Sequence, residues 1–304
     1  LFPYTTLFRS VEERMPLEAA ERSRAEAPFA RWLAAQKGVA SVWQPLRMVQ
    51  LGSAEGTQLT QAADGIIHAG GPNPKQDEYR MAARVKLPRI TGLKLEVFPV
   101  DGQLSRGKSG EFLLTNVKVQ TRQAGSSQIR DIAVRGAVAD FEADKAKNNN
   151  YGLVKDTLDD DPRNGWTTLG GDRTKPHTAV FELEEPLLLA PDEELMFEMR
   201  QRSTAGDANI ARFRVSVTDQ RGPAVQSVGP APLEELARTG LTPALRERLF
   251  TQFLADHAPY VQAKAALDRA TRQWEETKAA AKVDVMVLAE RTAPRETHVL
   301  RSEE

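Results

Sequence analysis

Short runs of alternating apolar and polar residues fill the chain from about residue 42 to residue 218. Around Lys94, for example, Leu93, Leu95 and Val97 occupy every second position. This alternation is typical of β-strands that bury one face and expose the other. Turn residues separate the runs, as they do in all-β domains. The sequence therefore predicts a mainly β fold, an antiparallel β-sandwich of the jelly-roll type.

The predicted strands are short and unevenly spaced. They lie at residues 43–51, 65–70, 78–87, 90–100, 112–122, 129–141, 177–185, 193–203 and 211–219. The uneven spacing argues against a propeller or a solenoid repeat. We expect one β-sandwich domain over residues 38–222.

A change to a helical pattern follows the Pro/Gly-rich stretch at 221–232, which predicts a linker over residues 223–230. Thr242 and Pro243 are typical of an N-cap and of the first helical position. A second helix is expected to end near Lys282. Its apolar stripe consists of Tyr260, Ala263, Leu267, Ala270, Trp274, Thr277 and Ala281. The two helices predict an α-helical hairpin over residues 231–282, and packing within the protein is the expected role of the stripe.

The two ends of the chain suggest a piece of a longer protein. Residues 1–10, LFPYTTLFRS, resemble the in-frame translation of a sequencing-library adapter, and we expect them to be foreign to the natural protein. Residues 11–37 are predicted to be a helical linker. Residues 283–304 have the pattern of an extended connector that leads to a further, C-terminal domain.

Composition excludes several classes of site. The 304 residues carry a net charge of −1, and no basic stripe indicates nucleic-acid binding. No apolar run is long enough to span a bilayer. The absence of cysteine excludes disulfides, thiolate zinc sites, cysteine nucleophiles and covalent haem attachment within this sequence.

One segment imitates a nucleotide-binding loop. GQLSRGKS at 102–109 has the residue spacing of a P-loop. A P-loop must lead into a helix whose N-terminus holds the phosphates. The residues that follow alternate like a strand, so we interpret the segment as a loop between strands.

Four aspartates crowd into the segment DTLDDDPRNGW at 156–166. Clustered carboxylates can bind calcium, which makes Asp156, Asp159 and Asp161 candidate ligands of a structural ion. The spacing does not match an EF-hand. The competing interpretation is a solvated turn in which the aspartates accept hydrogen bonds from local backbone amides.

Aromatic and polar residues near the predicted loops suggest a carbohydrate site. Sugars stack on exposed aromatic rings while polar side chains bind their hydroxyls. The candidate ligand-binding residues are Tyr79, Tyr151, Asn164, Trp166 and His177, and residues 148–150 add a polar loop. For Trp166 the alternative is a residue that closes the edge of the core, because large aromatic side chains are usually buried.

The order of an aspartate-rich turn, Gly165-Trp166 and the strand HTAVFELEE resembles the second half of discoidin-like, galactose-binding-like jelly rolls. The resemblance places Asp159 at the aspartate of that motif. It departs at Asp160, which stands where those domains have glycine.

A second resemblance covers most of residues 43–300. DGIIHAGGPNP, ITGLKLEVFP, GEFLLTNVKV, NGW, RFRVSVT and the connector VDVMVLAERTAPRETHVL occur in an order similar to that of the middle module of large planctomycete and verrucomicrobial proteins with a planctomycete-type cytochrome c domain. The resemblance implies an exported protein, periplasmic or at the cell surface. It also implies neighbouring domains of the same chain as partners, with haem held only in an upstream domain.

Catalysis has little support in the sequence. The four histidines are scattered, and no Gly-x-Ser-x-Gly elbow is present. Three hypotheses remain open. The first is a non-catalytic module that binds carbohydrate or organises neighbouring domains, the second a structural spacer without a ligand, and the third a sandwich-fold glycoside hydrolase with two carboxylates across a cleft.

Overall fold

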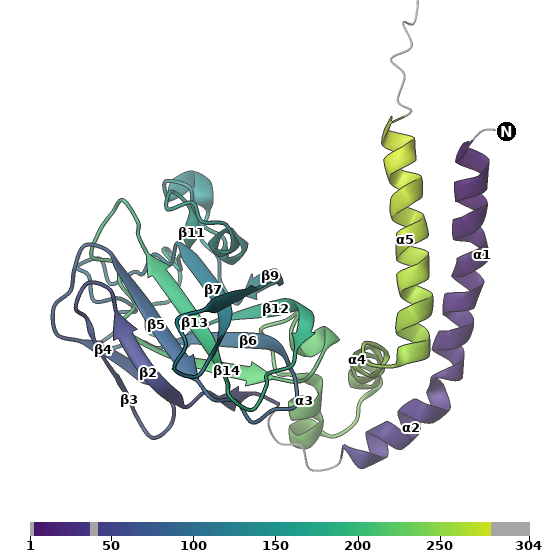
Figure 1. The fold of residues 1–304 in the computed structure, drawn as a ribbon, viewed down its shortest axis with the longest axis horizontal. Helices are drawn as coiled ribbons and strands as arrows, with labels where there is room; N and C mark the ends of the chain where they lie inside the picture. The colour runs from purple at the N-terminus through teal and green to yellow at the C-terminus, as the bar shows by residue number, and fades with distance from the viewer. Residues whose placement is uncertain (1–2, 37–41, 281–304) are drawn as a thin grey trace, which may run out of the picture. The chain divides into compact units, whose positions relative to one another are not determined.

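The computed structural model describes residues 3–36 and 42–280, in two compact units (Figure 1). One unit spans Arg24–Val261 and contains the strands. The other combines Leu1–Ser23 with Gln262–Glu304. None of the helices in the described ranges is long and apolar enough to cross a membrane.

The larger sheet, called sheet A, has the strand order β3-β4-β14-β6-β12-β9, and β1 pairs with β14. Its strands are β1 Gln44–Pro45, β3 Gln58–Gln61, β4 Ile67–Gly70, β6 Ile90–Val97, β9 Val134–Ala139, β12 His177–Leu187 and β14 Arg212–Thr218. Every pairing in this sheet is antiparallel.

The second sheet, called sheet B, has the order β2-β5-β13-β7-β8 and is also antiparallel. Its strands are β2 Met48–Ser53, β5 Asp77–Ala83, β7 Asn116–Gln123, β8 Ile129–Ile132 and β13 Glu193–Gln201. Two very short strands, β10 Tyr151–Gly152 and β11 Gly165–Trp166, form a separate parallel pair. Single turns of 3₁₀ helix precede them at η1 Lys145–Lys147 and η2 Val154–Leu158.

The main core lies between sheets A and B. Phe181 of β12 meets Phe197 of β13 with ring centroids 6.2 Å apart, and Tyr79 of β5 stacks on Phe213 of β14 at 5.9 Å. All four rings are buried. The predicted antiparallel β-sandwich is therefore confirmed.

The alternation along β6 decides which residues face this core. Leu93, Leu95 and Val97 are fully buried in it. Lys94 lies between Val180 of β12 and Ser216 of β14 in the register of sheet A, on the opposite, outer face. That outer face carries the pocket described below.

Some strand boundaries differ from the prediction. The predicted strand at 129–141 is two strands, because β8 belongs to sheet B and β9 to sheet A. The predicted strand at 43–51 is likewise divided between β1 and β2, which lie in different sheets. Strand β3, rich in glutamine and threonine, lies outside every predicted run.

Helices cover part of the outer face of sheet A. They are α2 Glu26–Ala35, α3 Pro232–Thr239 and α4 Pro243–Leu254, with the 3₁₀ turn η3 Gly222–Ala224. A second apolar core there joins Phe29, Trp43, Val180, Val225 and Leu249, among others. The predicted start of α4 is confirmed, since the Thr242 side chain accepts a hydrogen bond from Leu245 N at 3.2 Å and Pro243 follows it.

The second unit contains α1 Pro3–Arg24 and most of α5 Ala258–Ala280 (Figure 1). Phe8 of α1 contacts Trp274 of α5 with ring centroids 5.9 Å apart, so residues expected to be foreign form the start of a helix. The predicted stripe around Ala270 and Trp274 is the less exposed side of α5. Helices α4 and α5 belong to different units, so a hairpin between them stays a prediction. The connector at 283–304 lies outside the described residues.

Candidate functional site

Trp166, predicted to stack on sugar, lies fully buried in the main core. Phe112 meets its ring edge-on with centroids 4.9 Å apart, and its Nε1 donates a hydrogen bond to the Phe141 carbonyl oxygen at 2.9 Å. The backbones of Trp166 and Leu114 exchange hydrogen bonds of 2.8 and 2.9 Å. An indole without an exposed face cannot stack on a ligand. The structure therefore corrects this prediction and favours the alternative, a core residue.

Tyr151 and Asn164 are also buried, and both hold the aspartate-rich loop in place. The Tyr151 hydroxyl donates to the Pro162 carbonyl oxygen at 2.7 Å and accepts from Thr204 N at 3.3 Å. Asn164 Nδ2 donates to Asp159 Oδ2 at 3.0 Å. The Tyr151 hydroxyl and Asn164 Nδ2 thus serve the loop itself, while Asn164 Oδ1 is buried without a hydrogen-bond partner among the described residues. Neither side chain lies at an exposed surface where the prediction places a ligand.

Tyr79 lies in the centre of the sandwich rather than on a binding loop. Its ring is fully buried, and its hydroxyl donates to the Ile210 carbonyl oxygen at 3.1 Å. Burial raises the pKa of the Tyr79 hydroxyl, and Arg106 partly opposes that rise. The structure does not bring Tyr79 to the residues around Asn164, so its assignment to a sugar site was wrong.

The aspartates proposed to bind calcium are engaged by neighbouring groups. Asp156 pairs with Lys145 at 2.5 Å. Asp159 Oδ1 accepts from the backbone N–H of Asp161 at 3.0 Å. Asp161 accepts from Arg163 at 2.8 and 2.9 Å, and hydrogen bonds from that side chain lower the pKa of Asp161 to about 2.

These contacts match the competing interpretation of the segment, in which it is a solvated turn with internal hydrogen bonds. Across residues 3–36 and 42–280, no cluster of three or more histidines, aspartates or glutamates is placed to hold a metal ion. A structural calcium ion stays a prediction.

His177 lies at the start of β12 with both ring nitrogens beside acceptors. Nδ1 is 3.2 Å from Asp140 Oδ2, and Nε2 is 3.0 Å from the Asp172 carbonyl oxygen. The hydrogen bond to Asp140 raises the pKa of His177 above its ordinary value, because an imidazolium can donate from both nitrogens. Glu111 lies nearby, and burial raises the pKa of its carboxyl. His177 is buried and therefore does not offer a surface for sugar, contrary to the prediction.

The raised pKa of His177 predicts stability that falls as the pH rises. The folded state binds the His177 proton more tightly than the unfolded chain, so this stabilisation is complete below the unfolded pKa of about 6.5. It is lost as the pH rises through the folded pKa. Replacing His177 with glutamine should lower the free energy of unfolding by on the order of 1 kcal/mol at pH 5.5 and by clearly less at pH 8.5. Urea unfolding of both proteins at the two pH values measures this difference.

Asp140 offers an independent check on that pH dependence. Asp140→Asn removes the largest of the interactions that favour the imidazolium, so His177→Gln introduced into Asp140→Asn should show a smaller pH dependence, of which the Asp172 carbonyl and Glu111 supply the remainder. An equal cost of His177→Gln at both pH values in the native background would contradict the assignment.

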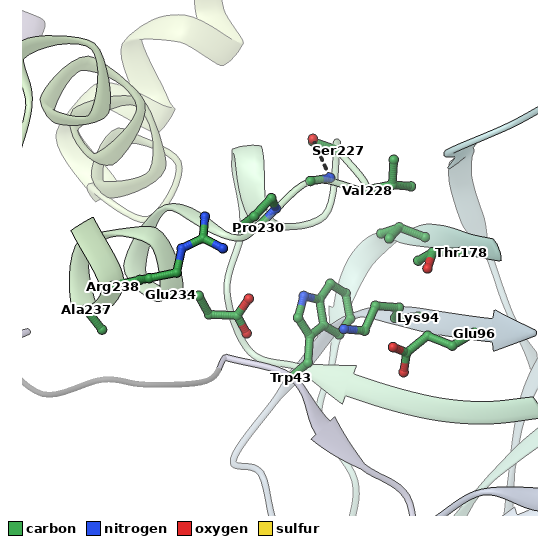
Figure 2. A pocket seen from close by; sticks show the side chains of 12 residues that line it. Trp43, Lys94, Glu96, Thr178, Ser227, Val228, Pro230, Glu234, Ala237 and Arg238 are labelled. Atoms are coloured by element: carbon green, nitrogen blue, oxygen red, sulfur yellow. Dashed lines mark hydrogen bonds between the residues drawn. The ribbon is translucent and has the colours of Figure 1, made fainter. Parts of the chain in front are cut away.

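A pocket of about 600 Å³ opens on the outer face of sheet A (Figure 2). Its floor is formed by Lys94 and Glu96 of β6 with Thr178 and Val180 of β12. The Trp43 side chain lies beside this floor. The opposite wall is formed by residues 227–230 and by the side chains of α3 that follow, Glu234, Ala237 and Arg238 (Figure 2).

Lys94 and Trp43 interact directly in this pocket. Lys94 Nζ lies 5.1 Å from the centroid of the indole, within the range of a cation–π interaction. The pKa of Lys94 is lowered, chiefly because burial removes water from the ammonium group, while Glu96 and Glu234 oppose that lowering. Lys94 makes no salt bridge with any residue in the described part of the chain.

The carboxylates of the pocket are each held by other donors. Arg214 donates to Glu96 at 2.8 and 3.1 Å. Glu234 accepts from the backbone N–H of Val42 at 3.0 Å and of Ala231 at 3.4 Å, the second bond closing the first turn of α3. Both carboxylates thus have local structural roles, whereas the ammonium of Lys94 lies against the indole face and forms no salt bridge within the described ranges.

The sequence pattern does not predict this pocket. Lys94 is visible in the sequence as an outward residue of an alternating strand, and Trp43 as the first residue of the predicted strand at 43–51. Nothing in the local pattern shows that the segment 224–238 folds back over that strand face. The sequence signal that could have indicated the pocket is weak. It consists of a lysine on the outward side of a central strand and an apolar segment that covers this side of the strand.

Comparison with protein-family models and with curated proteins gives no significant match to this chain.

Proposed function

We propose that the chain is a non-catalytic carbohydrate-binding module, and that its ligand occupies the pocket of Trp43 and Lys94. The observation that carries this proposal is the pocket itself. It is open to solvent and combines an indole with hydroxyl, carboxylate and cationic side chains on rigid strands and a helix. Trp43 lines the pocket but is only 7% exposed, so its polar side chains form most of the surface offered to a sugar, and convergent polar groups of this kind can bind sugar hydroxyls.

The state of the carboxylates favours binding over hydrolysis. A glycosidase needs one carboxylic acid to donate a proton and a second carboxylate to act on the sugar or on water. Glu96 is held by two hydrogen bonds from Arg214, and Glu234 caps α3. Carboxylates that are held in this way support a pocket that binds and orients a ligand rather than one that hydrolyses it. The spacer hypothesis gives no reason for an open pocket whose lysine forms no salt bridge with any residue that the structure describes.

The fold and the setting of this module belong to the same proposal. We infer a jelly roll of the galactose-binding type, supported by the antiparallel pairing throughout sheets A and B, in which neighbours such as β5 and β13 come from distant parts of the chain. An exported protein with a planctomycete-type cytochrome c domain elsewhere in the chain is the setting that the sequence resemblance implies. Neighbouring domains would then be its partners.

The test is glycan-array binding by the intact chain, first with calcium and then with EDTA. We expect saturable binding to a defined polysaccharide. Gly229→Trp should weaken it at least tenfold, because Gly229 is exposed at the pocket wall and a large side chain there fills the pocket. Trp43→Phe should weaken it less, and its stability has to be measured in parallel because Trp43 is a buried residue of the second apolar core.

Ser127→Trp is the matched control, since it places the same side chain in the exposed turn between β7 and β8. This variant should bind like the native protein. Loss of binding in EDTA would support the calcium prediction. A folded protein that binds no glycan would contradict the proposal and favour the spacer hypothesis.

A further inference from the structure

We propose that the pocket selects acidic sugars, and that Lys94 binds the carboxylate of a uronic acid residue. This inference rests on the proposed function, since it names the class of carbohydrate that the same pocket takes. It is carried by the arrangement of charges around Lys94.

Lys94 is a partly desolvated cation that forms no salt bridge with any residue in 3–36 or 42–280. Its side chain is half-buried beneath the pocket, and its ammonium touches the Trp43 ring rather than a carboxylate. Removing a charge from water is unfavourable unless a partner of opposite charge replaces the lost hydration. A ligand carboxylate in the pocket would supply that partner.

The carboxylates around Lys94 are held by other groups, so a ligand carboxylate can occupy the position beside its ammonium. Glu96 is bound by Arg214, and Glu234 is bound by backbone N–H groups. Arg238 adds a second cation at the exposed side of α3, without a salt bridge to any residue in the described ranges (Figure 2). Two cations that form no ion pair within the described part of the chain therefore line one pocket.

The same residues favour a singly charged carboxylate over a phosphate. Glu96 and Glu234 both lie close enough to influence the charge of Lys94. They would repel a doubly charged anion more strongly than a single carboxylate. The half-buried hydroxyl of Thr178 and the apolar side chain of Val228 match the body of a sugar ring, which phosphate lacks.

The experiment compares one acidic polysaccharide with its carboxyl-reduced form. Reduction converts each uronic acid residue into the neutral hexose and leaves the linkages unchanged. Oligosaccharides of polygalacturonate, polyglucuronate and alginate are tested in both forms by isothermal titration with the intact chain. We expect at least one acidic oligosaccharide to bind tenfold or more tightly than its reduced form.

Variants locate the preference in the pocket. Lys94→Met keeps the length of the side chain and removes its charge, so the preference for the acidic form should disappear. Arg238→Gln changes an exposed residue that the fold does not need, and it should reduce the preference by a smaller factor. Lys86→Met, at an exposed lysine outside the pocket, is the matched control and should keep the native preference.

The outcomes separate this inference from the proposed function. Equal affinity for acidic and reduced forms, lost on Gly229→Trp, would overturn the selection of acidic sugars and leave the carbohydrate pocket intact. Binding of neither form by folded protein would overturn both. Displacement of a bound uronate by an equal concentration of inorganic phosphate would overturn the assignment to a sugar carboxylate. An unchanged preference in folded Lys94→Met would remove Lys94 from the site.

Discussion

Replacing Trp166 with alanine is expected to lower the free energy of unfolding by about 3–5 kcal/mol. The indole is fully buried against Phe112, and its loss leaves a cavity that the sandwich cannot fill. The change also removes the hydrogen bond from Nε1 to the Phe141 carbonyl oxygen. Urea unfolding, followed by circular dichroism, measures this loss of stability.

Trp274→Ala is the control, because Trp274 is only partly buried and lies in the helical unit. It should leave the stability of the sandwich nearly unchanged. If Trp166→Ala were as stable as the native protein, the indole could not be part of the core, and its sequence-based assignment to a binding surface would regain support. Any loss of glycan binding in Trp166→Ala has to be measured at a temperature at which the variant is folded.

A second large effect is expected at Gly165, where alanine should destabilise the protein by about 2–5 kcal/mol. Gly165 has φ of 140°, a conformation that residues with a side chain rarely adopt. An added Cβ would lie 2.3 Å from the Leu114 carbonyl oxygen and 2.8 Å from Thr115 Cα. The chain would have to move where Trp166 and Leu114 are joined by backbone hydrogen bonds.

Gly136→Ala is the matched control for this substitution. Gly136 lies in β9 with open space around the position of a Cβ, and its φ lies outside the left-handed region. Alanine there should change the stability by less than about 1 kcal/mol. Thermal unfolding of both variants compares them directly. Equal stability of Gly165→Ala and Gly136→Ala would contradict the close approach of β11 to Leu114.

The sandwich could be predicted because alternation is a local property of each strand. In β6, Leu93 and Leu95 face the core, as the alternation of apolar and polar residues predicts. The division of 129–141 could not be predicted, since both halves have the composition of a strand. Only the pairing of β8 with β7 and of β9 with β12 shows that the chain crosses between sheets at this point.

The site was harder to predict because it depends on segments that are distant in the sequence. Trp166 has the appearance of a binding residue beside an aspartate-rich turn, yet Phe112 and Leu114 bury it from another part of the chain. Lys94 looks like an ordinary outward residue of a strand. Trp43 and Glu234 give it a pocket only when the chain has folded.

The most direct test of the pocket is ¹⁹F NMR of the intact chain labelled with 5-fluorotryptophan. The sequence has four tryptophans, and substitution of each by phenylalanine assigns the four signals. Titration with the glycan identified on the array should shift the signal of Trp43 saturably, while that of buried Trp166 stays unchanged. A bound glycan that leaves Trp43 unaffected and shifts Trp166 would contradict the pocket on sheet A and return the site to the aspartate-rich loop.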